Sequence, residues 1–110
     1  MATLVDLGNY RRARSQVSLQ PDELRALMNV YSRYVMAGEW KDYAIDFQPG
    51  YASFTMFKHT FDQPLFSVVK IRRRVGGLEW LIFKGRERVR RAQELADALV
   101  YFDNKMQIVR

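Results

Sequence analysis

The residues best suited to binding chemistry are concentrated in one short stretch, residues 70–91. This stretch holds nine of the chain's eighteen Lys and Arg residues but only two of its twelve Asp and Glu residues, which gives it a net charge of +7. The whole chain of 110 residues has a net charge of +6. Charge confined in this way attracts a polyanion or an acidic surface more strongly than the same charge spread evenly.

We predict that this stretch contacts the phosphates of a nucleic acid, because phosphate contacts supply most of the affinity in such complexes. The predicted contact residues are Lys70, Arg72, Arg74, Arg86, Arg88, Arg90 and Arg91. The sequence leaves DNA and RNA equally open. The alternative is an adaptor or regulatory protein that docks an acidic protein surface, since the same cations would serve it.

Aromatic side chains near the cations could add stacking on unpaired bases. Phe66 and Phe83 alternate with basic residues in this way, and Tyr51 is a weaker candidate. The alternative is that both Phe rings pack beneath a helix or a second subunit, because aromatic pairs across strands are ordinary sheet contacts.

Other chemistry has less support. The chain has no cysteine, which excludes disulfides and thiolate metal sites, and His59 is its single histidine. Asp42 and Asp46 could share one side of a strand and hold a divalent ion, although solvated edge charges are by far the commoner explanation of such a pair. No Ser-His-Asp set, phosphate-binding glycine loop or dinucleotide motif is present. We therefore expect a protein without enzymatic activity, cofactor or metal; a deep pocket containing Asp46 or His59 would reopen the question.

A first helix is predicted to begin at Pro21, a residue that suits the first helical position, and to stop at Gly38. The apolar residues expected on its buried face are Leu24, Leu27, Met28, Tyr31, Tyr34 and Val35.

A first hairpin is predicted around Pro49-Gly50, the centre of a type II turn. Its register places three apolar pairs on one side: Tyr43 with Met56, Ile45 with Phe54, and Phe47 with Ala52. A slip of one residue would mix apolar and polar side chains on both sides, so the pattern fixes the register.

A second hairpin is predicted from Leu65 to Lys84 around Gly76-Gly77. This register pairs Arg74 with Glu79, Arg72 with Leu81, Lys70 with Phe83, and Arg73 with Trp80. The expected core side consists of Val69, Ile71, Trp80 and Ile82. The other side combines Lys70, Arg72 and Arg74 with Phe66, Val68, Leu81 and Phe83.

A last helix is predicted over residues 86–104, with its arginines in the first turns, where they and free backbone N–H groups could share a phosphate. Its expected buried stripe is Val89, Ala92, Leu95, Ala96, Leu99 and Phe102. The fold class is therefore α+β: an antiparallel four-stranded meander flanked by an N-terminal and a C-terminal helix (αββββα). Residues 17–110 are expected to form one domain, preceded by a flexible basic arm at residues 1–16.

The block from Ala37 to Asp46, together with Glu23-Leu24 and Tyr31, resembles a family of short alphaproteobacterial proteins that form a domain of unknown function. The resemblance covers roughly residues 19–103 and implies no activity, cofactor or site residue. From the residues themselves, we expect Trp40 to close the core where the first helix leads into the sheet, with a binding role as the alternative.

No apolar run approaches the ~20 residues that span a bilayer, so we expect no membrane contact and a cytoplasmic protein. Two helices can cover one face of a sheet or divide between its two faces. If both cover one face, we expect a homodimer sealed through the second hairpin; one helix on each face predicts a monomer.

Overall fold

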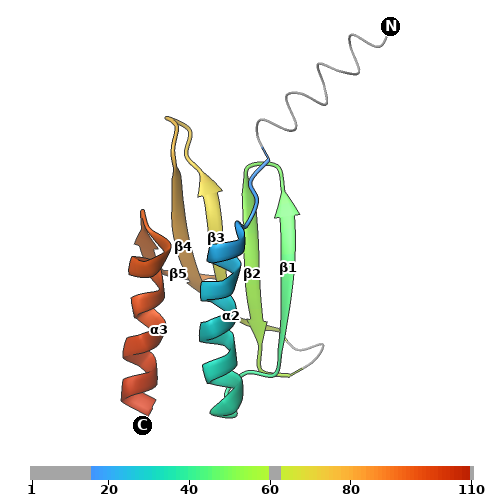
Figure 1. The fold of residues 1–110 in the computed structure, drawn as a ribbon, viewed down its shortest axis with the longest axis vertical. Coiled ribbons are helices and arrows are strands. Elements are labelled where there is room, and N and C mark those ends of the chain that lie inside the picture. The colour runs from blue at the N-terminus through green and yellow to red at the C-terminus, as the bar shows by residue number, and fades with distance from the viewer. Residues whose placement is uncertain (1–15, 60–62, 110) are drawn as a thin grey trace, which may run out of the picture.

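Both helices of this protein pack on the same face of one antiparallel sheet (Figure 1). The computed structural model describes residues 16–59 and 63–109. The elements are α2 (Pro21–Met36), β1 (Asp42–Gln48), β2 (Tyr51–Phe57), β3 (Pro64–Arg72), β4 (Leu78–Lys84), β5 (Glu87–Ala92) and α3 (Leu95–Val109). The strands lie in chain order, each antiparallel to its neighbour. The predicted α+β class is confirmed, but the meander has five strands rather than four.

Helix α2 forms as its terminal residues predict. Pro21 is its first residue, and the side chain of Glu23 accepts a hydrogen bond of 2.8 Å from the backbone N–H of Gln20. This contact satisfies a donor that the helix leaves free. The chain leaves the helix through Gly38, whose φ of 79° few other residues adopt. Leu27, Val30 and Tyr34 are its buried residues, whereas Val35, expected on that face, is 39% exposed.

The first hairpin has the predicted register. Tyr43 pairs with Met56, Ile45 with Phe54 and Phe47 with Ala52 across β1 and β2. Ala52, Phe54 and Met56 face the helices and are fully buried. Local turn chemistry and a clean alternation of apolar and polar residues were therefore enough to define this hairpin.

The register of the second hairpin differs from the prediction by three residues. Lys70 pairs with Trp80, and Val69 pairs with Leu81, because the loop spans residues 73–77 instead of two glycines. The backbone N–H of Arg73 donates to Gly77 O at 2.9 Å and closes this loop. An odd shift exchanges the strand faces that meet. Phe66, Val68, Trp80 and Ile82 consequently face the helices, while Val69, Ile71, Leu81 and Phe83 face away.

The predicted last helix begins too early. Residues 87–92 form β5, which hydrogen-bonds to the edge of β4, and α3 starts only at Leu95. Gly85, with a φ of 60°, turns the chain between β4 and β5. Pairing with an otherwise free strand edge outweighs the helical propensity of this segment. In α3, Ala98, Leu99 and Phe102 are buried, and Ala96 is exposed.

The core lies between the two helices and the covered face of the sheet. Trp40 is 3% exposed and stacks on Tyr34, with ring centroids 4.2 Å apart and planes 13° apart. The Tyr34 hydroxyl donates a 2.6 Å hydrogen bond to the carbonyl of Phe102 in α3. Trp40 thus closes the core at the corner between α2 and β1, as expected, and its burial leaves little ring surface for a ligand.

The expected N-terminal arm lies outside the described residues except for Gln16, which forms a β-bridge with Pro49. Within the described ranges, no helix combines the length and apolar character needed to cross a membrane.

Candidate nucleic-acid interface

The seven predicted contact residues do not form one surface. Arg72 and Arg74 lie at the tip of the β3–β4 hairpin, whereas Arg86 lies in the β4–β5 turn at the opposite end of β4. Arg88 and Arg91 lie on the sheet face away from the helices, because they pair with Phe83 and Leu81 on either side of an irregularity in the β4–β5 register. Lys70 and Arg90 pair with Trp80 and Ile82 on the helix-covered face. The high local charge in the sequence is therefore divided over four regions.

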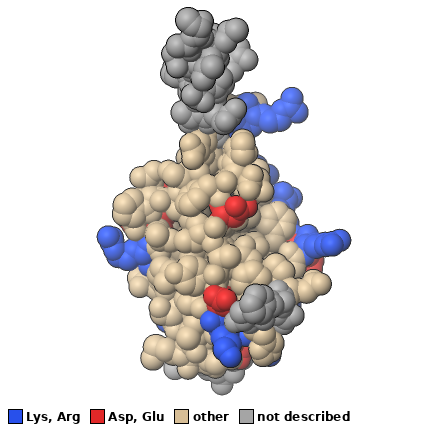
Figure 2. Space-filling model, turned by 90° about the vertical axis from the view of Figure 1, so that its right-hand side faces the viewer, with Lys and Arg blue, Asp and Glu red and all other residues tan. Residues whose placement is uncertain are grey.

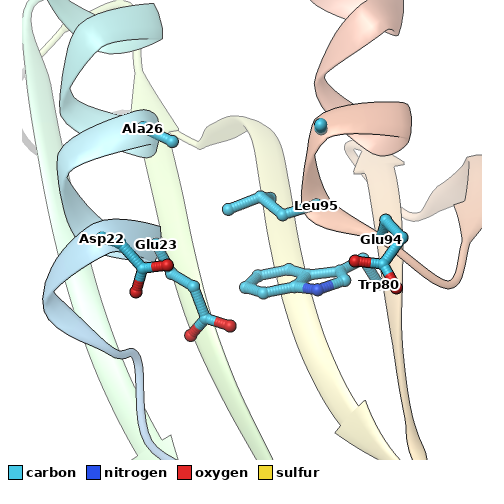
Figure 3. A pocket seen from close by; sticks show the side chains of 7 residues that line it. Asp22, Glu23, Ala26, Trp80, Glu94 and Leu95 are labelled. Atoms are coloured by element: carbon cyan, nitrogen blue, oxygen red, sulfur yellow. The ribbon is translucent and has the colours of Figure 1, made fainter.

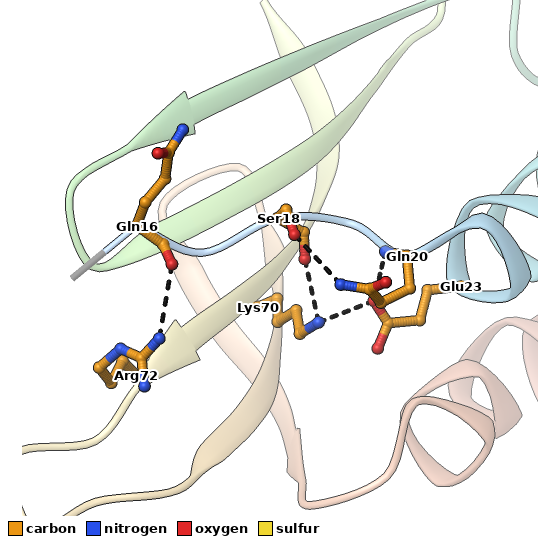
Figure 4. Close-up of polar contacts among 6 residues, drawn as sticks. All are labelled: Gln16, Ser18, Gln20, Glu23, Lys70 and Arg72. Carbon is orange, nitrogen blue, oxygen red and sulfur yellow. Dashed lines mark hydrogen bonds and ion pairs between the residues drawn. The ribbon is translucent and has the colours of Figure 1, made fainter. Parts of the chain in front are cut away.

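Lys70 has a structural role (Figure 4). Its side chain is 7% exposed, and its ammonium group donates to a Glu23 carboxylate oxygen at 2.8 Å and to Ser18 O at 3.0 Å. The ammonium also lies 5.7 Å from the centre of the Trp80 ring. A buried charge needs such partners, and these contacts leave Lys70 no access to a phosphate. The sequence prediction failed here because the three-residue register shift placed Lys70 under α2.

Two further arginines are engaged within the fold. Arg91 Nε donates to the Glu79 carboxylate at 2.7 Å, which offsets one positive charge, and Arg90 Nε donates to the carbonyl of Asp97 at 2.9 Å. Because residues 87–92 are a strand, the predicted phosphate site at a helix N-terminus is wrong.

The aromatic residues considered for base stacking also lie in different environments. Phe66 is 4% exposed and contacts Trp40 and Phe102 in the core, so base stacking on its ring is excluded. Phe83 is half-buried on the uncovered face of the sheet, and Tyr51 on the same face is 37% exposed.

The strongest remaining cationic feature is residues 72–77, which we call the basic hairpin tip. It carries three consecutive arginines, Arg72, Arg73 and Arg74. Arg72 Nη2 donates to Gln16 O at 3.4 Å (Figure 4), and Arg73 Nε donates to Gly76 O at 3.3 Å. Across the described residues, no carboxylate forms an ion pair with any of the three. Backbone carbonyls orient two of the guanidiniums without neutralising them.

Arg73 is a candidate that the sequence analysis missed. The assumed two-residue loop paired it with Trp80 on the core side, but it lies at the start of a five-residue loop instead. Its guanidinium lies close to Gly77, where an added Cβ would stand 3.3 Å from Arg73 Nη2. Three adjacent arginines followed by Val-Gly-Gly are a signal for an exposed basic loop, and this signal was available in the sequence.

A shallow hollow of about 280 Å³ opens between the N-terminal ends of α2 and α3 (Figure 3). Asp22, Glu23 and Glu94 line it, and Trp80 contributes one wall. Its acidic lining disfavours a phosphate, and the one ammonium group nearby, that of Lys70, is already paired with Glu23. The hollow itself is therefore unsuitable as a phosphate site.

The remaining candidates occupy separate places. His59 is exposed after β2, and Asp46 accepts hydrogen bonds from Gln48 at 3.0 and 3.2 Å. Among the described residues, no three His, Cys, Asp or Glu side chains are grouped so that they could hold a metal. Figure 2, which views the side of the β1 edge, shows Lys and Arg standing apart from one another around the margins.

These features define a small α+β domain in which two helices cover one face of a five-stranded meander and an arginine-rich hairpin tip extends past the helices (Figure 1). The chain belongs to the family described as a protein of unknown function (DUF2794), whose model matches residues 17–99. This confirms the family resemblance expected from the sequence, while the alphaproteobacterial origin stays a prediction. No curated protein and no solved structure is significantly similar to the chain.

Proposed function

We propose that this protein binds nucleic acid non-enzymatically, through phosphate contacts made by Arg72, Arg73 and Arg74. The observation that carries the proposal is the basic hairpin tip: three adjacent guanidiniums, two of them oriented by backbone carbonyls, with no carboxylate paired to them in the described part of the chain. Guanidinium groups match phosphate oxygens in geometry as well as in charge.

The shape of the tip supports the same proposal. It is the end of a two-stranded ribbon, and Figure 1 shows it extending beyond the ends of α2 and α3. The major groove of duplex DNA, about 12 Å wide, admits a two-stranded ribbon. Arginines at the end of such a ribbon can reach the phosphates on the two sides of the groove.

The test is a binding titration on duplex DNA, single-stranded DNA and RNA across salt concentrations. Three phosphate contacts on a duplex predict a slope of log K against log salt of about −2.7, so affinity should fall about 40-fold between 50 and 200 mM salt. Each single change, Arg72→Gln, Arg73→Gln or Arg74→Gln, should make the slope less negative by about 1.

Two controls separate this effect from loss of charge in general. Lys41→Gln removes one exposed positive charge just before β1, at the end of the sheet far from the tip, and should leave the slope unchanged. A chain with all three tip arginines changed to Gln should lose binding. The proposal is overturned if no complex forms at low salt, or if the triple variant binds as well as the natural chain. Recovery of one acidic protein after nuclease treatment, without nucleic-acid binding, would favour the adaptor alternative.

A further inference from the structure

The face of the sheet opposite the helices, which we call the open face, is apolar at its centre. Val69 and Ile71 of β3 and Leu81 and Phe83 of β4 all point to it; Leu81 is 8% exposed and the other three are half-buried. No element among the described residues covers it, because both helices lie on the other side (Figure 1). Apolar sheet faces of this kind usually mark an interface.

The two edges of the open face carry opposite charges. One row across the sheet runs from Asp46 on β1 through Ser53, Val69 and Leu81 to Arg91 on β5. Asp42 lies further along β1 on the same face, and Arg88 lies on β5 opposite Phe83. Glu79 of β4 also lies on this face, because it pairs with Ile71, and it holds Arg91 in an ion pair at 2.7 Å. Arg88 forms no ion pair with a described carboxylate, so it keeps the β5 edge basic. The open face is thus acidic along the β1 edge, mostly apolar along β3 and β4, and basic along the β5 edge.

We infer that two copies of this chain associate face to face through their open faces, with β1 of each copy opposite β5 of the other. A symmetric dimer of this kind has its two-fold axis in the plane between the sheets. An axis parallel to the strands brings Asp46 opposite the partner's Arg91 and places Val69 near the axis. An axis across the strands would bring Asp46 opposite the partner's Asp46. Charge complementarity selects the first arrangement.

The area of the face suits a reversible dimer. Five strands about 4.8 Å apart, with about seven residues of 3.3 Å each, give a projected face of about 550 Å² per copy. Side-chain relief adds to this figure, so the pair buries about the 1,000 Å² that the smallest specific interfaces require. We therefore expect an equilibrium between monomer and dimer that depends on concentration.

The orientation of the dimer has a consequence for binding, which rests on the proposed function. A two-fold axis parallel to the strands makes the corresponding strands of the two copies run in the same direction. Both basic hairpin tips then lie at the same end of the dimer and present six arginines to one polyanion. The salt slope on a duplex long enough for both tips should double to about −5.

The first experiment is sedimentation of the full chain from 1 to 300 μM. We expect a mass that rises from the 13.0 kDa of one chain toward twice that value. Phe83→Ser should keep the chain monomeric without unfolding it, because Phe83 points away from the helix-covered core. Lys41→Gln is the matched control and should dimerise like the natural chain. A single species of 13.0 kDa at every concentration would overturn the inference.

The second experiment tests the orientation. Asp46→Arg should weaken dimerisation at least 10-fold, because the new arginine would face the partner's Arg91, and adding Arg91→Asp in the same chain should restore most of it. If Asp46→Arg instead strengthens the dimer, β1 lies opposite β1 and the proposed arrangement is wrong. Circular dichroism of each variant shows whether it remains folded.

The two proposals fail separately. A monomer that binds duplex DNA with a salt slope near −2.7 would remove the dimer and leave the proposed function intact. A dimer that binds no nucleic acid would overturn the proposed function and leave the dimer intact.

Discussion

The contact between Lys70 and Glu23 gives a sharp prediction, because the two charges differ in their access to water. The side chain of Lys70 is 7% exposed and that of Glu23 is 20% exposed. Removing either charge breaks the same 2.8 Å ion pair, but the charge that remains is less accessible to water when it is the Lys70 ammonium than when it is the Glu23 carboxylate. We expect Glu23→Gln to destabilise the protein more than Lys70→Met does.

The magnitudes follow from the contacts that remain. In Glu23→Gln the buried ammonium keeps Ser18 O at 3.0 Å and the Trp80 ring at 5.7 Å but loses its carboxylate, which should cost about 2–4 kcal/mol. In Lys70→Met the carboxylate still accepts the Gln20 N–H at 2.8 Å and reaches water. The methionine also keeps an apolar stem against Trp80, so the cost should be about 1 kcal/mol or less.

The assay is urea unfolding of the natural chain, the two single variants and the double variant. With a typical slope for a domain of this size, Glu23→Gln should lower the midpoint by about 1–2 M. The double variant should resemble Lys70→Met alone, because no buried charge is left unpaired. Equal costs for the two single changes, or a larger cost for Lys70→Met, would refute the idea that Lys70 is a desolvated charge. Lys70→Met should also leave the salt slope of nucleic-acid binding unchanged, since Lys70 cannot reach a phosphate.

Two further predictions concern stability. Burial raises the pKa of Tyr34 above its ordinary value of 10.0, so the unfolded chain releases this proton before the folded chain does. The free energy of unfolding should therefore stay constant below pH 10 and fall as the pH rises through the raised pKa. Tyr34→Phe should reduce that fall. At pH 7 the same change should cost about 1 kcal/mol of stability, because the hydrogen bond to Phe102 O is lost. An unchanged alkaline slope in calorimetry would contradict this. Gly77→Ala should lower the free energy of unfolding by about 1–2 kcal/mol in thermal unfolding, because φ is 83° at this position and the new Cβ would approach the Arg73 guanidinium. Pro49→Ala, in a turn without that contact, should cost less.

Helix α2 and the first hairpin could be predicted from the sequence. Pro21 and Gly38 mark the two ends of α2, and Pro49-Gly50 defines the register of the first hairpin. In both cases turn or end chemistry agrees with the period of the apolar residues, so only one arrangement satisfies both. The family was recognisable for a similar reason, since the block from Ala37 to Asp46 is continuous in the chain.

The candidate site followed from the sequence only in part. The sequence identified the basic stretch and two arginines of the hairpin tip, Arg72 and Arg74. It placed Arg73 on the wrong side and treated Lys70 as a surface cation. Both errors come from one assumption, a two-residue turn at Gly76-Gly77 where the chain forms a longer loop. Several loop lengths are compatible with two adjacent glycines, and each gives a different register.

What the sequence determined by itself is the class of the fold, the first three elements and the presence of a concentrated positive charge. Only the tertiary structure decided that residues 87–92 form β5, because these residues also suit a helix and it is the free edge of β4, just across the turn at residues 85–86, that pairs them as a strand. The added strand places Arg88 and Arg91 on the open face, whereas the register of the β3–β4 hairpin places three arginines at its tip and buries Lys70 in an ion pair. Where a charged side chain comes to lie depends on the register in which its strand pairs, and local propensity contains no information about that register.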